Sequence, residues 1–431
     1  MLIRFPSKIA STAELEAHQL AGLKWTVRHA FDNSPFYRNL LMKKGIKPGF
    51  IRTLADLRLL PLLTAQDLAD GYPFPLRSVP FADLVRIHAS SGTTGKRKIL
   101  CYTQKDLEDW QIMFARCYEL AGLAREDRVQ ISVGYGLWTA GVGFQQACEK
   151  FGAMAIPVGP GNLEIQTNFL IDLQATVFCC TASMGLLLAE DIHRRGLKEK
   201  LNLKKIILGA ERSSSSMLET MRECLGVDEI YDIIGLTEVY GPGAGISCRY
   251  GSSIHYWADY YILEVLDPKT LEPVTPGEVG EMVYTTLGKE GAPLIRYRSR
   301  DLTRLIDGEC ACGCWLPRHD RILGRSDDVV IFRGVNIYPG QVDEVLNRVK
   351  GIGSEYQVFF DHGEDGRDTM LVRVERTKNS DTLPDDLVIK QIAGGIKHTL
   401  LISCSVELVD YGALPRSERK TKRIFDNRKF E

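Results

Sequence analysis

The stretch Ser90-Ser91-Gly92-Thr93-Thr94-Gly95-Lys96 combines four hydroxyl groups, two glycines and one ammonium within seven residues. Glycine allows the backbone to turn tightly, so that successive N–H groups can converge on one anion. The hydroxyls add hydrogen-bond donors, and Lys96 adds a mobile positive charge. The stretch differs from a Walker A loop because only two residues separate Gly92 from Gly95, where that motif has four. It therefore predicts a polyphosphate-binding loop, and a flexible polar linker is the alternative interpretation.

The surrounding region, from about residue 84 to residue 290, alternates short apolar runs with helical stretches. The runs are rich in β-branched residues, and each one ends at a glycine or a polar turn. This alternation is typical of a parallel sheet whose strands are joined by helices. The predicted strands are Val129–Val133, Ala153–Val158, Thr176–Cys180, Lys205–Leu208 and Glu229–Ile233.

Other segments of the chain differ in the spacing of their apolar side chains. Residues 12–45 carry apolar side chains at spacings of three and four, as in a helix, and Asn33-Ser34-Pro35 interrupts this pattern. Tyr260–Leu266 and Gly280–Thr286 alternate in polarity like antiparallel strands. After Arg325, a shorter segment shows strand, helix and strand signals and ends in a basic tail.

These patterns predict an α/β protein with two domains, because 431 residues are too many for one ordinary core. We expect a large N-terminal domain over residues 1–325, with mixed and mostly parallel sheets and helices. Residues 326–431 are expected to form a small α+β domain.

Composition restricts the classes of partner. Hydrophobic residues make up 44% and charged residues 25% of the chain, and its net charge is −1. This balance gives no electrostatic reason to expect nucleic acid or an anionic membrane as a partner. No apolar run reaches the ~18 residues of a membrane span, and the N-terminal residues lack a signal-peptide pattern. Eleven cysteines without such a signal are typical of a reducing compartment, so we expect a cytoplasmic protein.

Five further motifs follow the glycine-rich stretch in order. They are Gly209-Ala210-Glu211, Asp232-Ile233-Ile234-Gly235-Leu236-Thr237-Glu238, Tyr297-Arg298-Ser299-Arg300-Asp301-Leu302, Gly324-Arg325-Ser326-Asp327-Asp328 with Arg333–Pro339, and Leu414–Lys420. Taken together, these motifs resemble the acyl-adenylate-forming (AMP-binding) ligases. The details at His88–Gly95, Tyr135-Gly136-Leu137 and Arg333–Pro339 are most similar to the phenylacetate–CoA ligase branch. The resemblance covers roughly residues 20–428.

The resemblance implies an ATP-dependent acid–CoA ligase. Such enzymes join a carboxylate to the α-phosphate of ATP, release pyrophosphate, and then transfer the acyl group from AMP to a thiol. It implies ATP, Mg²⁺ and CoA as ligands, an aryl or arylalkyl acid as substrate, and it is compatible with a homodimer. The alternatives are transfer to a carrier protein, AMP left on a non-CoA acceptor, and a nucleotide- or acyl-binding regulator without catalysis.

The resemblance also assigns nucleotide-binding residues. Glu238 matches the Mg²⁺ ligand, and Mg²⁺ is usually held by one or two carboxylates together with phosphate oxygens. Thr237 matches a hydroxyl donor to the α-phosphate, and Asp301 matches the carboxylate that binds the ribose diol. The other residues of the expected nucleotide site are Ser90, Ser91, Gly92, Thr93, Thr94, Gly95, Lys96, Gly209, Ala210, Glu211, Asp232, Ile234 and Arg325.

Each of these acidic and basic residues has a structural alternative. Glu238 could be a solvated loop carboxylate. Asp301 could form a surface ion pair with Arg298 or Arg300. Arg325 could form a salt bridge at the domain boundary.

Lys420 matches the lysine that bridges the carboxylate and the α-phosphate, where a cation stabilises developing negative charge. The chain departs from the family here, because Arg419 stands where glycine is usual, and Lys422 is an alternative cation. Ile234 stands where the family often has an aromatic residue that stacks on adenine. Asp327 matches the hinge about which the C-terminal domain rotates between the two reactions, and this implies a mobile C-terminal domain.

The segment from Tyr135 to Gly141 matches part of the acyl pocket in the phenylacetate branch. Aromatic and small side chains alternate there, which suits a flat apolar ring, whereas helical core packing is the alternative. The expected substrate-binding residues are Tyr135, Gly136, Trp138, Ala140 and Gly141. The sequence leaves the identity of the acid open.

Three cysteines lie within the five residues Cys310–Cys314, and Cys248 precedes His255 by seven residues. Two thiolates from one tight loop and a cysteine and histidine from another segment would complete a tetrahedral zinc site. We expect Cys248, His255, Cys310 and Cys312 to hold a structural Zn²⁺, with Cys314 as a spare. Reduced cysteines in a glycine-containing turn are the alternative.

Overall fold

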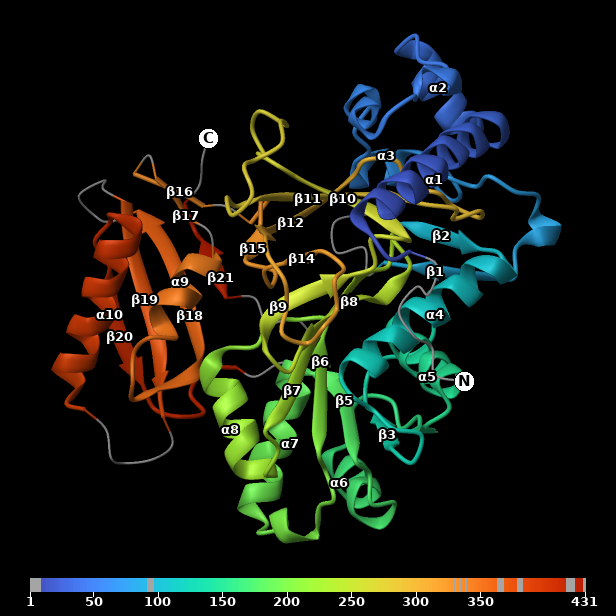
Figure 1. Ribbon diagram of the computed structural model, residues 1–431. Coiled ribbons are helices and arrows are strands. Elements are labelled where there is room, and N and C mark those ends of the chain that lie inside the picture. The colour runs from blue at the N-terminus through green and yellow to red at the C-terminus, as the bar shows by residue number, and fades with distance from the viewer. Residues whose placement is uncertain are drawn as a thin grey trace. The chain divides into compact units, whose positions relative to one another are not determined.

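A computed structural model describes residues 9–90, 97–328, 330–333, 335–337, 339–362, 368–377, 383–415 and 423–428 (Figure 1). The chain forms two compact units. The first consists of Met1–Thr181, Glu199–Ala210 and Val227–Arg321, and the second consists of Ala182–Lys198, Glu211–Gly226 and Ile322–Glu431. The long segment of the second unit begins close to residue 326, where the sequence predicts a boundary, but two earlier segments also belong to this unit.

The first unit is built around a nine-stranded sheet with the strand order β13-β14-β9-β8-β7-β6-β5-β3-β4. The last five strands in this order are parallel, and β8, β9, β14 and β13 continue the sheet by antiparallel pairing. The nine strands are β3 (Arg128–Ile131), β4 (Met154–Ile156), β5 (Val177–Thr181), β6 (Lys205–Gly209), β7 (Glu229–Leu236), β8 (Gly241–Cys248), β9 (Gly251–Tyr256), β13 (Leu305–Ile306) and β14 (Arg318–His319). The predicted parallel strands are confirmed.

Three antiparallel strands form a second layer in the first unit, and these are β10 (Tyr261–Leu266), β11 (Gly280–Thr286) and β12 (Tyr297–Thr303). The predicted antiparallel strands near 260–266 and 280–286 are therefore confirmed. A separate antiparallel hairpin of β1 (Arg86–Ala89) and β2 (Ile99–Tyr102) flanks the glycine-rich stretch. The stretch thus connects two paired strands.

The helices of the first unit are α1 (Thr12–Asn33), α2 (Pro35–Lys43), α3 (Ala65–Asp70), α4 (Gln104–Leu120), α5 (Ala140–Phe151) and α6 (Leu163–Asp172). Ser34 separates α1 from α2, and its side chain accepts a hydrogen bond from the backbone N–H of Tyr37. This confirms the predicted interruption. Helices α4 and α5 pack against each other and against β8.

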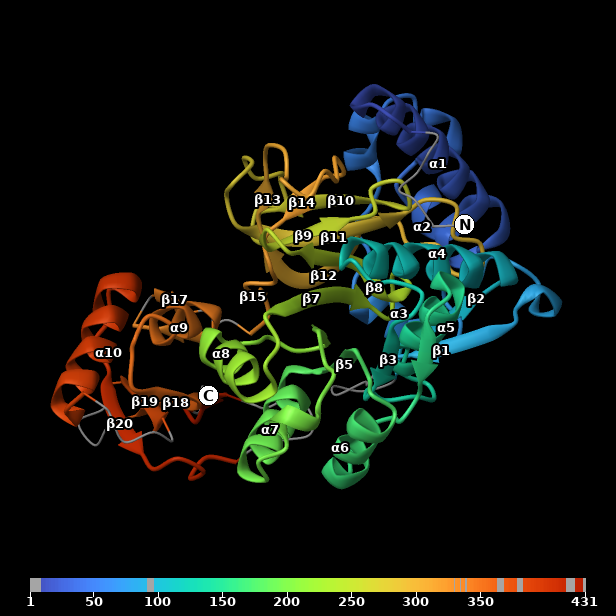
Figure 2. The same cartoon turned by 60° about the horizontal axis from the view of Figure 1, so that its bottom comes forward.

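The second unit contains the sheet β20-β19-β18-β21 and a core of apolar side chains. Helix α10 contributes Val388, Ile392, Ile396 and Leu400 at four-residue spacing, so one face of the helix packs on this core. Figure 2 shows α10 beside β18, β19 and β20. The elements are α7 (Ala182–Arg194), α8 (Ser215–Leu225), β15 (Gly324–Arg325), β16 (Val330–Phe332), β17 (Val335–Ile337), α9 (Pro339–Leu346), β18 (Ile352–His362), β19 (Asp368–Arg376), α10 (Asp385–Leu400), β20 (Ser405–Val409) and β21 (Ile424–Asp426).

The predicted fold class is confirmed: the protein is α/β, with a mostly parallel main sheet in the larger unit and a smaller unit of mixed sheet and helices. Across the described ranges, none of the helices has the length and apolar character needed to cross a membrane.

Candidate active site

The turn after β7 carries Thr237 and Glu238, and both side chains are buried. β7 ends at Leu236, and the chain returns as β8 from Gly241. Gly235 permits this close return, because a Cβ at this position would lie 2.0 Å from the carbonyl oxygen of Gly241. The turn is therefore fixed by backbone sterics at the edge where the parallel strands end.

The Glu238 carboxylate is held by two side chains that are distant in sequence. Lys98 Nζ lies 2.5 Å from Glu238 Oε1, and the Tyr297 hydroxyl donates a hydrogen bond of 3.0 Å to the same oxygen. A buried carboxylate is stable only when charge and hydrogen bonds compensate the loss of water. Both of these contacts are made to Oε1.

Lys289 supports the backbone of the same turn. Its fully buried ammonium donates hydrogen bonds to the carbonyl oxygens of Glu238 (3.1 Å) and Val239 (2.6 Å). It also lies 4.8 Å from the ring centres of Tyr102 and Tyr240, as in cation–π contacts. Burial lowers the pKa of Lys289 to about 8. The Tyr102 hydroxyl binds the turn as well, at 2.9 Å from the carbonyl oxygen of Tyr240.

Sequence reasoning did not identify Lys98, Lys289 or Tyr102 as site residues. Tyr297 stands at the start of the Tyr297–Leu302 motif, but the motif itself assigns it no role. Lys98 lies two positions beyond the glycine-rich stretch, and this proximity was the one signal that could have found it. Lys289 carries no local signal, because its partners lie some fifty residues away along the chain.

Backbone contacts place the predicted acyl segment beside both β1 and the turn. The carbonyl oxygen of Leu137 accepts a hydrogen bond of 2.9 Å from the N–H of Ala89, and it lies 3.2 Å from Nδ1 of His88. The hydroxyl oxygens of Thr139 and Thr237 are 3.5 Å apart. The predicted acyl segment, the end of β1 and the turn after β7 therefore lie close together.

Within the acyl segment, the small residues make room for the aromatic ones. A Cβ on Gly141 would lie 2.4 Å from the ring of Tyr135, so only glycine fits there. Gly136 has a left-handed φ of +89°. Ala140 is buried at the start of α5, whereas Trp138 is 36% exposed. Burial raises the pKa of Tyr135 to about 12.

The turn after β6 and the middle of β7 carry further residues that are predicted to bind the nucleotide. A Cβ on Gly209 would lie 2.9 Å from a side-chain carbon of Ile233, and Ala210 has a φ of +70°. Such backbone strain often marks functional turns. Asp232 and Ile234 lie within β7 and not at its end, and Ile234 is buried.

Asp301 lies on β12, and its N–H donates a hydrogen bond of 3.0 Å to the Ser299 hydroxyl. The neighbouring guanidinium groups of Arg298 and Arg300 both contact Glu281, at 2.8 Å and 3.5 Å. The two arginines named as alternative partners of Asp301 thus bind another carboxylate.

Part of the predicted site lies outside the described residues. This applies to Ser91, Gly92, Thr93, Thr94, Gly95 and Lys96 and to Arg419, Lys420 and Lys422. Ser90 is described: its N–H donates a hydrogen bond of 3.1 Å to the carbonyl oxygen of Lys98. The N–H of Lys98 donates in return to the Ser90 hydroxyl at 3.4 Å. Ser90, the first residue of the stretch, is therefore joined to Lys98, two residues beyond its end.

Three predicted residues belong to the second unit. Glu211 accepts hydrogen bonds from the backbone N–H (2.6 Å) and the hydroxyl (2.9 Å) of Ser183, near the start of α7. Arg325 forms a two-bond ion pair with Asp327, with both N···O distances at 2.9 Å. The predicted nucleotide contact and the predicted hinge residue therefore bind each other.

The predicted metal ligands come together in the first unit. The ligand atoms of Cys248, His255, Cys310 and Cys312 all lie within 4.8 Å of one another. The sulfur atoms of Cys248 and Cys310 are 3.5 Å apart, and Cys312 Sγ lies 3.3 Å from His255 Nε2. A tetrahedral zinc ion with sulfur and nitrogen ligands requires ligand separations of about 3.4–3.8 Å. Cys314 stands outside the cluster, and its N–H donates to Cys312 Sγ at 3.4 Å.

The protonation of this cluster follows from its burial. Burial raises the pKa of the Cys248 thiol and raises that of Cys312 to about 12. Burial, together with the charge of Arg318, lowers the pKa of His255 to about 4, so its imidazole is neutral. A neutral imidazole is the form that binds metal, and thiols release their protons when a metal binds.

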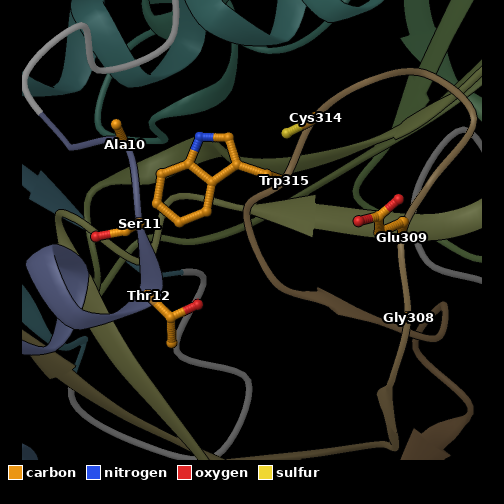
Figure 3. A pocket seen from close by; sticks show the side chains of 7 residues that line it. All are labelled: Ala10, Ser11, Thr12, Gly308, Glu309, Cys314 and Trp315. Atoms are coloured by element: carbon orange, nitrogen blue, oxygen red, sulfur yellow. The ribbon is translucent and has the colours of Figure 1, made fainter.

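A surface cavity of about 390 Å³ lies next to the cysteine loop (Figure 3). Trp315 projects between the start of α1 at Ala10–Thr12 and the loop that carries Glu309. No predicted substrate or nucleotide residue lines this cavity, which is therefore separate from the convergent site.

Comparisons with known proteins identify the family of this chain. The sequence model for the AMP-binding enzyme matches residues 37–288, and that for the AMP-binding enzyme C-terminal domain matches residues 334–428. The phenylacetate-coenzyme A ligase of Escherichia coli (strain K12) is 39% identical over 431 residues, which cover 98% of this chain and 97% of the relative. The phenylacetate-coenzyme A ligase of Thermus thermophilus is 38% identical over 436 residues, with 96% and 97% covered.

Among solved structures, 2-hydroxyisobutyryl-CoA ligase in the postadenylation state, in complex with 2-HIB-AMP, is similar with a TM-score of 0.88. The match covers 98% of this chain and 91% of that chain at 25% identity. Family motifs, near full-length relatives and fold agree. The chain belongs to the AMP-binding enzyme family, in its phenylacetate–coenzyme A ligase branch.

Proposed function

We propose that this chain is an ATP-dependent acid–CoA ligase that converts an aryl or arylalkyl carboxylic acid, through its acyl adenylate, into an acyl-CoA with release of AMP and pyrophosphate. Four relatives at 37–39% identity over nearly their whole length support this assignment. The observation that carries it is the buried Glu238 carboxylate, which contacts Lys98, two residues beyond the glycine-rich stretch, and follows Thr237, which lies against Thr139 of the Tyr135–Gly141 segment.

Glu238 is the proposed ligand of Mg²⁺. Its carboxylate supplies the hard oxygen donors that Mg²⁺ prefers, and the Lys98 and Tyr297 contacts are both made to Oε1. A bound Mg²⁺ would neutralise phosphate charge at this position. Thr237 is proposed to donate its hydroxyl to the α-phosphate, and Asp301 to bind the ribose diol. Lys420 is proposed to stabilise negative charge between the carboxylate and the α-phosphate.

The remaining site assignments rest on the family motifs. Residues 90–96, Gly209, Ala210, Glu211, Asp232, Ile234 and Arg325 are proposed to bind the nucleotide. Tyr135, Gly136, Trp138, Ala140 and Gly141 are proposed to contact the acid. Residues 1–325 and 326–431 are proposed as domains, with Asp327 as a hinge between the adenylation and thioester states.

The Cys248, His255, Cys310 and Cys312 cluster is proposed to hold a structural Zn²⁺. Two of its ligand separations, 3.5 Å between the sulfurs of Cys248 and Cys310 and 3.3 Å between Cys312 Sγ and His255 Nε2, are close to those of a tetrahedral site, which supports this. Four protein ligands leave no open position for substrate, so the ion would join the β8–β9 hairpin to the 310–314 loop. The eleven cysteines form no disulfides, which supports a reducing, cytoplasmic location. A homodimer stays a prediction.

The function is tested by measuring pyrophosphate release from Mg-ATP with a panel of aryl, arylalkyl and aliphatic acids, with and without CoA. We expect an aryl or arylalkyl acid to trigger release and CoA to convert the adenylate into a thioester. Release without thioester formation would indicate another acceptor, such as a carrier protein. No release with any acid would contradict the proposed activity and favour a binding regulator.

A further inference from the structure

Two buried side chains bind the four carbonyl oxygens of the turn at residues 237–240. Lys289 donates hydrogen bonds to the second and third of these oxygens, at 3.1 Å and 2.6 Å. The Tyr102 hydroxyl lies 3.1 Å from the first and 2.9 Å from the fourth, and its one hydrogen is shared between them. The N–H groups of the last two residues of the turn donate to the carbonyl oxygen of Leu236. The turn is therefore held by hydrogen bonds to its carbonyl groups and to two of its N–H groups.

Lys289 is itself fixed from the side of α4. Asp106, a fully buried residue in the first turn of α4, accepts hydrogen bonds from the N–H groups of Glu290 (2.7 Å) and Gly291 (2.8 Å). A Cβ on Gly291 would lie 2.6 Å from the carbonyl oxygen of Cys101 in β2, so this strand passes close to the same backbone. Burial lowers the pKa of Lys289, and the negative charge of Asp106 opposes this effect. Helix α4 therefore anchors the backbone next to Lys289 and stabilises the charge of its ammonium.

The Lys289 ammonium cannot reach a bound ligand directly. The side chain is fully buried, and its ammonium lies 4.8 Å from the ring centres of both Tyr102 and Tyr240. An exposed lysine moves between many rotamers, whereas this packing keeps the ammonium next to the two carbonyl oxygens that it binds. Any effect of Lys289 on a ligand must therefore pass through the turn.

The turn carries the two side chains to which the proposed function assigns the phosphate and the metal. Thr237 is assigned to the α-phosphate and Glu238 to Mg²⁺. Because Mg²⁺ requires near-ideal octahedral geometry, its ligands must be placed precisely. A site that moves by about 1 Å loses much of its activity. Removal of the ammonium would free two adjacent peptide groups of the turn, one of which belongs to Glu238 itself.

From these contacts we propose that Lys289 is a positioning residue for the adenylation reaction. By holding the carbonyl oxygens of Glu238 and Val239, it fixes the turn so that Thr237 and Glu238 are correctly placed for Mg-ATP. The inference rests on the proposed function and on Glu238 as the Mg²⁺ ligand. It predicts that loss of the ammonium loosens the turn even in the nucleotide-free protein, and that it raises the Mg²⁺ concentration that the enzyme requires.

The loosening is measured by amide hydrogen exchange on the nucleotide-free, full-length protein without metal or substrate. In K289M, we expect the N–H groups of residues 237–240 to exchange at least about tenfold faster than in the wild type, because local opening of the turn costs less. Exchange at the wild-type rate in K289M would overturn the proposal. If K289M does not fold, K289Q provides a second uncharged variant, which should exchange at least about threefold faster than the wild type.

K105M is the matched control, because it makes the same substitution beside the same backbone. The Lys105 ammonium donates to the carbonyl oxygen of Gly288 at 2.9 Å, outside the turn. Y37F controls for lost stability: the buried Tyr37 hydroxyl donates to the carbonyl oxygen of Pro293, also outside the turn. In both variants, residues 237–240 should exchange like those of the wild type. An acceleration equal to that of K289M in either control would overturn the specific role of Lys289.

The same variants are compared in the pyrophosphate-release assay by varying Mg²⁺ at a fixed ATP concentration. K289M should raise the half-saturating Mg²⁺ concentration at least about tenfold and leave KM for the acid within about twofold. A merely destabilised enzyme contains fewer active molecules, which lowers the maximal rate but not the half-saturating Mg²⁺ concentration. K105M and Y37F should keep the wild-type Mg²⁺ requirement. A wild-type requirement in K289M would overturn the link between Lys289 and the metal ligand, even if the turn exchanges faster.

Failure of the underlying assignments can be recognised separately. A wild-type Mg²⁺ requirement in E238Q would contradict Glu238 as the metal ligand, whatever the behaviour of K289M. If the wild type releases no pyrophosphate with any acid, the proposed function is wrong. The exchange rates of nucleotide-free K289M would then still decide whether Lys289 holds the turn.

Discussion

Lys289 is a fully buried lysine whose ammonium binds the backbone of the turn that carries Glu238. Methionine has a similar length but no donor, so K289M leaves two carbonyl oxygens without this partner. We expect K289M to lower the free energy of unfolding by about 2–4 kcal/mol, measured by urea denaturation. Lys105 is the control: its side chain is 48% exposed, and its ammonium pairs with Asp109. K105M should cost under about 1 kcal/mol, and an equal loss in both variants would contradict the role of Lys289.

His88 makes the stability depend on pH. Burial lowers its pKa to about 4, below the ordinary value of 6.5. When the pH falls below 6.5, the unfolded chain therefore binds a proton at this residue before the folded chain does, and stability is lost progressively down to about pH 4. We expect a loss of about 2 kcal/mol over this window, measured by urea denaturation at several pH values.

H88N should reduce that pH dependence, because asparagine can donate to the Leu137 carbonyl without titrating. It should not abolish the dependence, because burial lowers the pKa of His255 and of His319 to about 4 as well. H398N replaces an exposed histidine of α10 and serves as the control. A wild-type pH profile in H88N would show that other groups cause the loss.

For single residues, the sequence predicts the site residues that stand in local motifs and misses those whose role depends on tertiary contacts. Cys248, His255 and the 310–314 loop could be predicted because spacing restricts metal ligands, and the structure brings them together. Lys98 and Lys289 could not be assigned, since lysine is usually a surface residue and their partners are remote in sequence.

Among the elements, β7 and β8 form a tight antiparallel return that depends on Gly235. A Cβ at this position would lie 2.0 Å from the Gly241 carbonyl oxygen, and 2.4 Å from Cα of Pro242. G235A should therefore force the strands apart and lower the free energy of unfolding by about 2–3 kcal/mol. Gly251, at the start of β9, has no atom within 4 Å of such a Cβ. G251A should change stability little, and similar unfolding midpoints for the two variants would contradict this interpretation.

The cysteine and histidine cluster links the β8–β9 hairpin to the 310–314 loop. If it holds zinc, elemental analysis should find about one zinc per chain, and chelation should lower Tm by at least about 5 °C. C312S should show the same loss without a chelator. C404S replaces a partly buried cysteine of the second unit and should keep both zinc and Tm. Unchanged zinc content in C312S would contradict the ligand set.

β8 shows why some elements escape sequence analysis. Its first five residues, Gly241–Gly245, include three glycines and a proline, which indicate a turn and not a strand. The fold requires those glycines: a Cβ on Gly241 would lie 2.5 Å from the Trp110 ring, and one on Gly243 would lie 2.5 Å from the Phe114 ring. The aromatic side chains of α4 thus fill the space beside the strand, and only the packed structure shows this. The parallel strands, by contrast, could be predicted from their β-branched runs.

For the molecule as a whole, the hinge can be tested through the two half-reactions. Proline fixes φ, so D327P should restrict the rotation proposed at this position. We expect D327P to slow thioester formation from the acyl adenylate by at least about tenfold more than it slows pyrophosphate release. D327A removes the same ion pair with Arg325 but keeps backbone freedom, so it should alter both rates alike. Equal effects of D327P on both rates would contradict a hinge at residue 327.

The division of the chain into units was only partly predictable. The change of pattern after Arg325 lies close to the start of the long segment of the second unit at Ile322. The two earlier segments, Ala182–Lys198 and Glu211–Gly226, join this unit through contacts such as the ion pair between Arg212 and Asp343. Their helical patterns resemble those of the neighbouring helices, so periodicity alone could not assign them.

The hydrogen bonds between Ser90 and Lys98 have a consequence for nucleotide affinity. Bringing the ends of a loop together costs conformational entropy, and a binding site assembled only on contact with its ligand loses affinity by that amount. In this protein the β1–β2 ladder brings the two ends together during folding. The entropy cost of closing the loop is therefore offset by the folding of the hairpin and does not reduce the affinity for the ligand. Mutations that destabilise the hairpin should consequently weaken nucleotide binding even when they touch no phosphate.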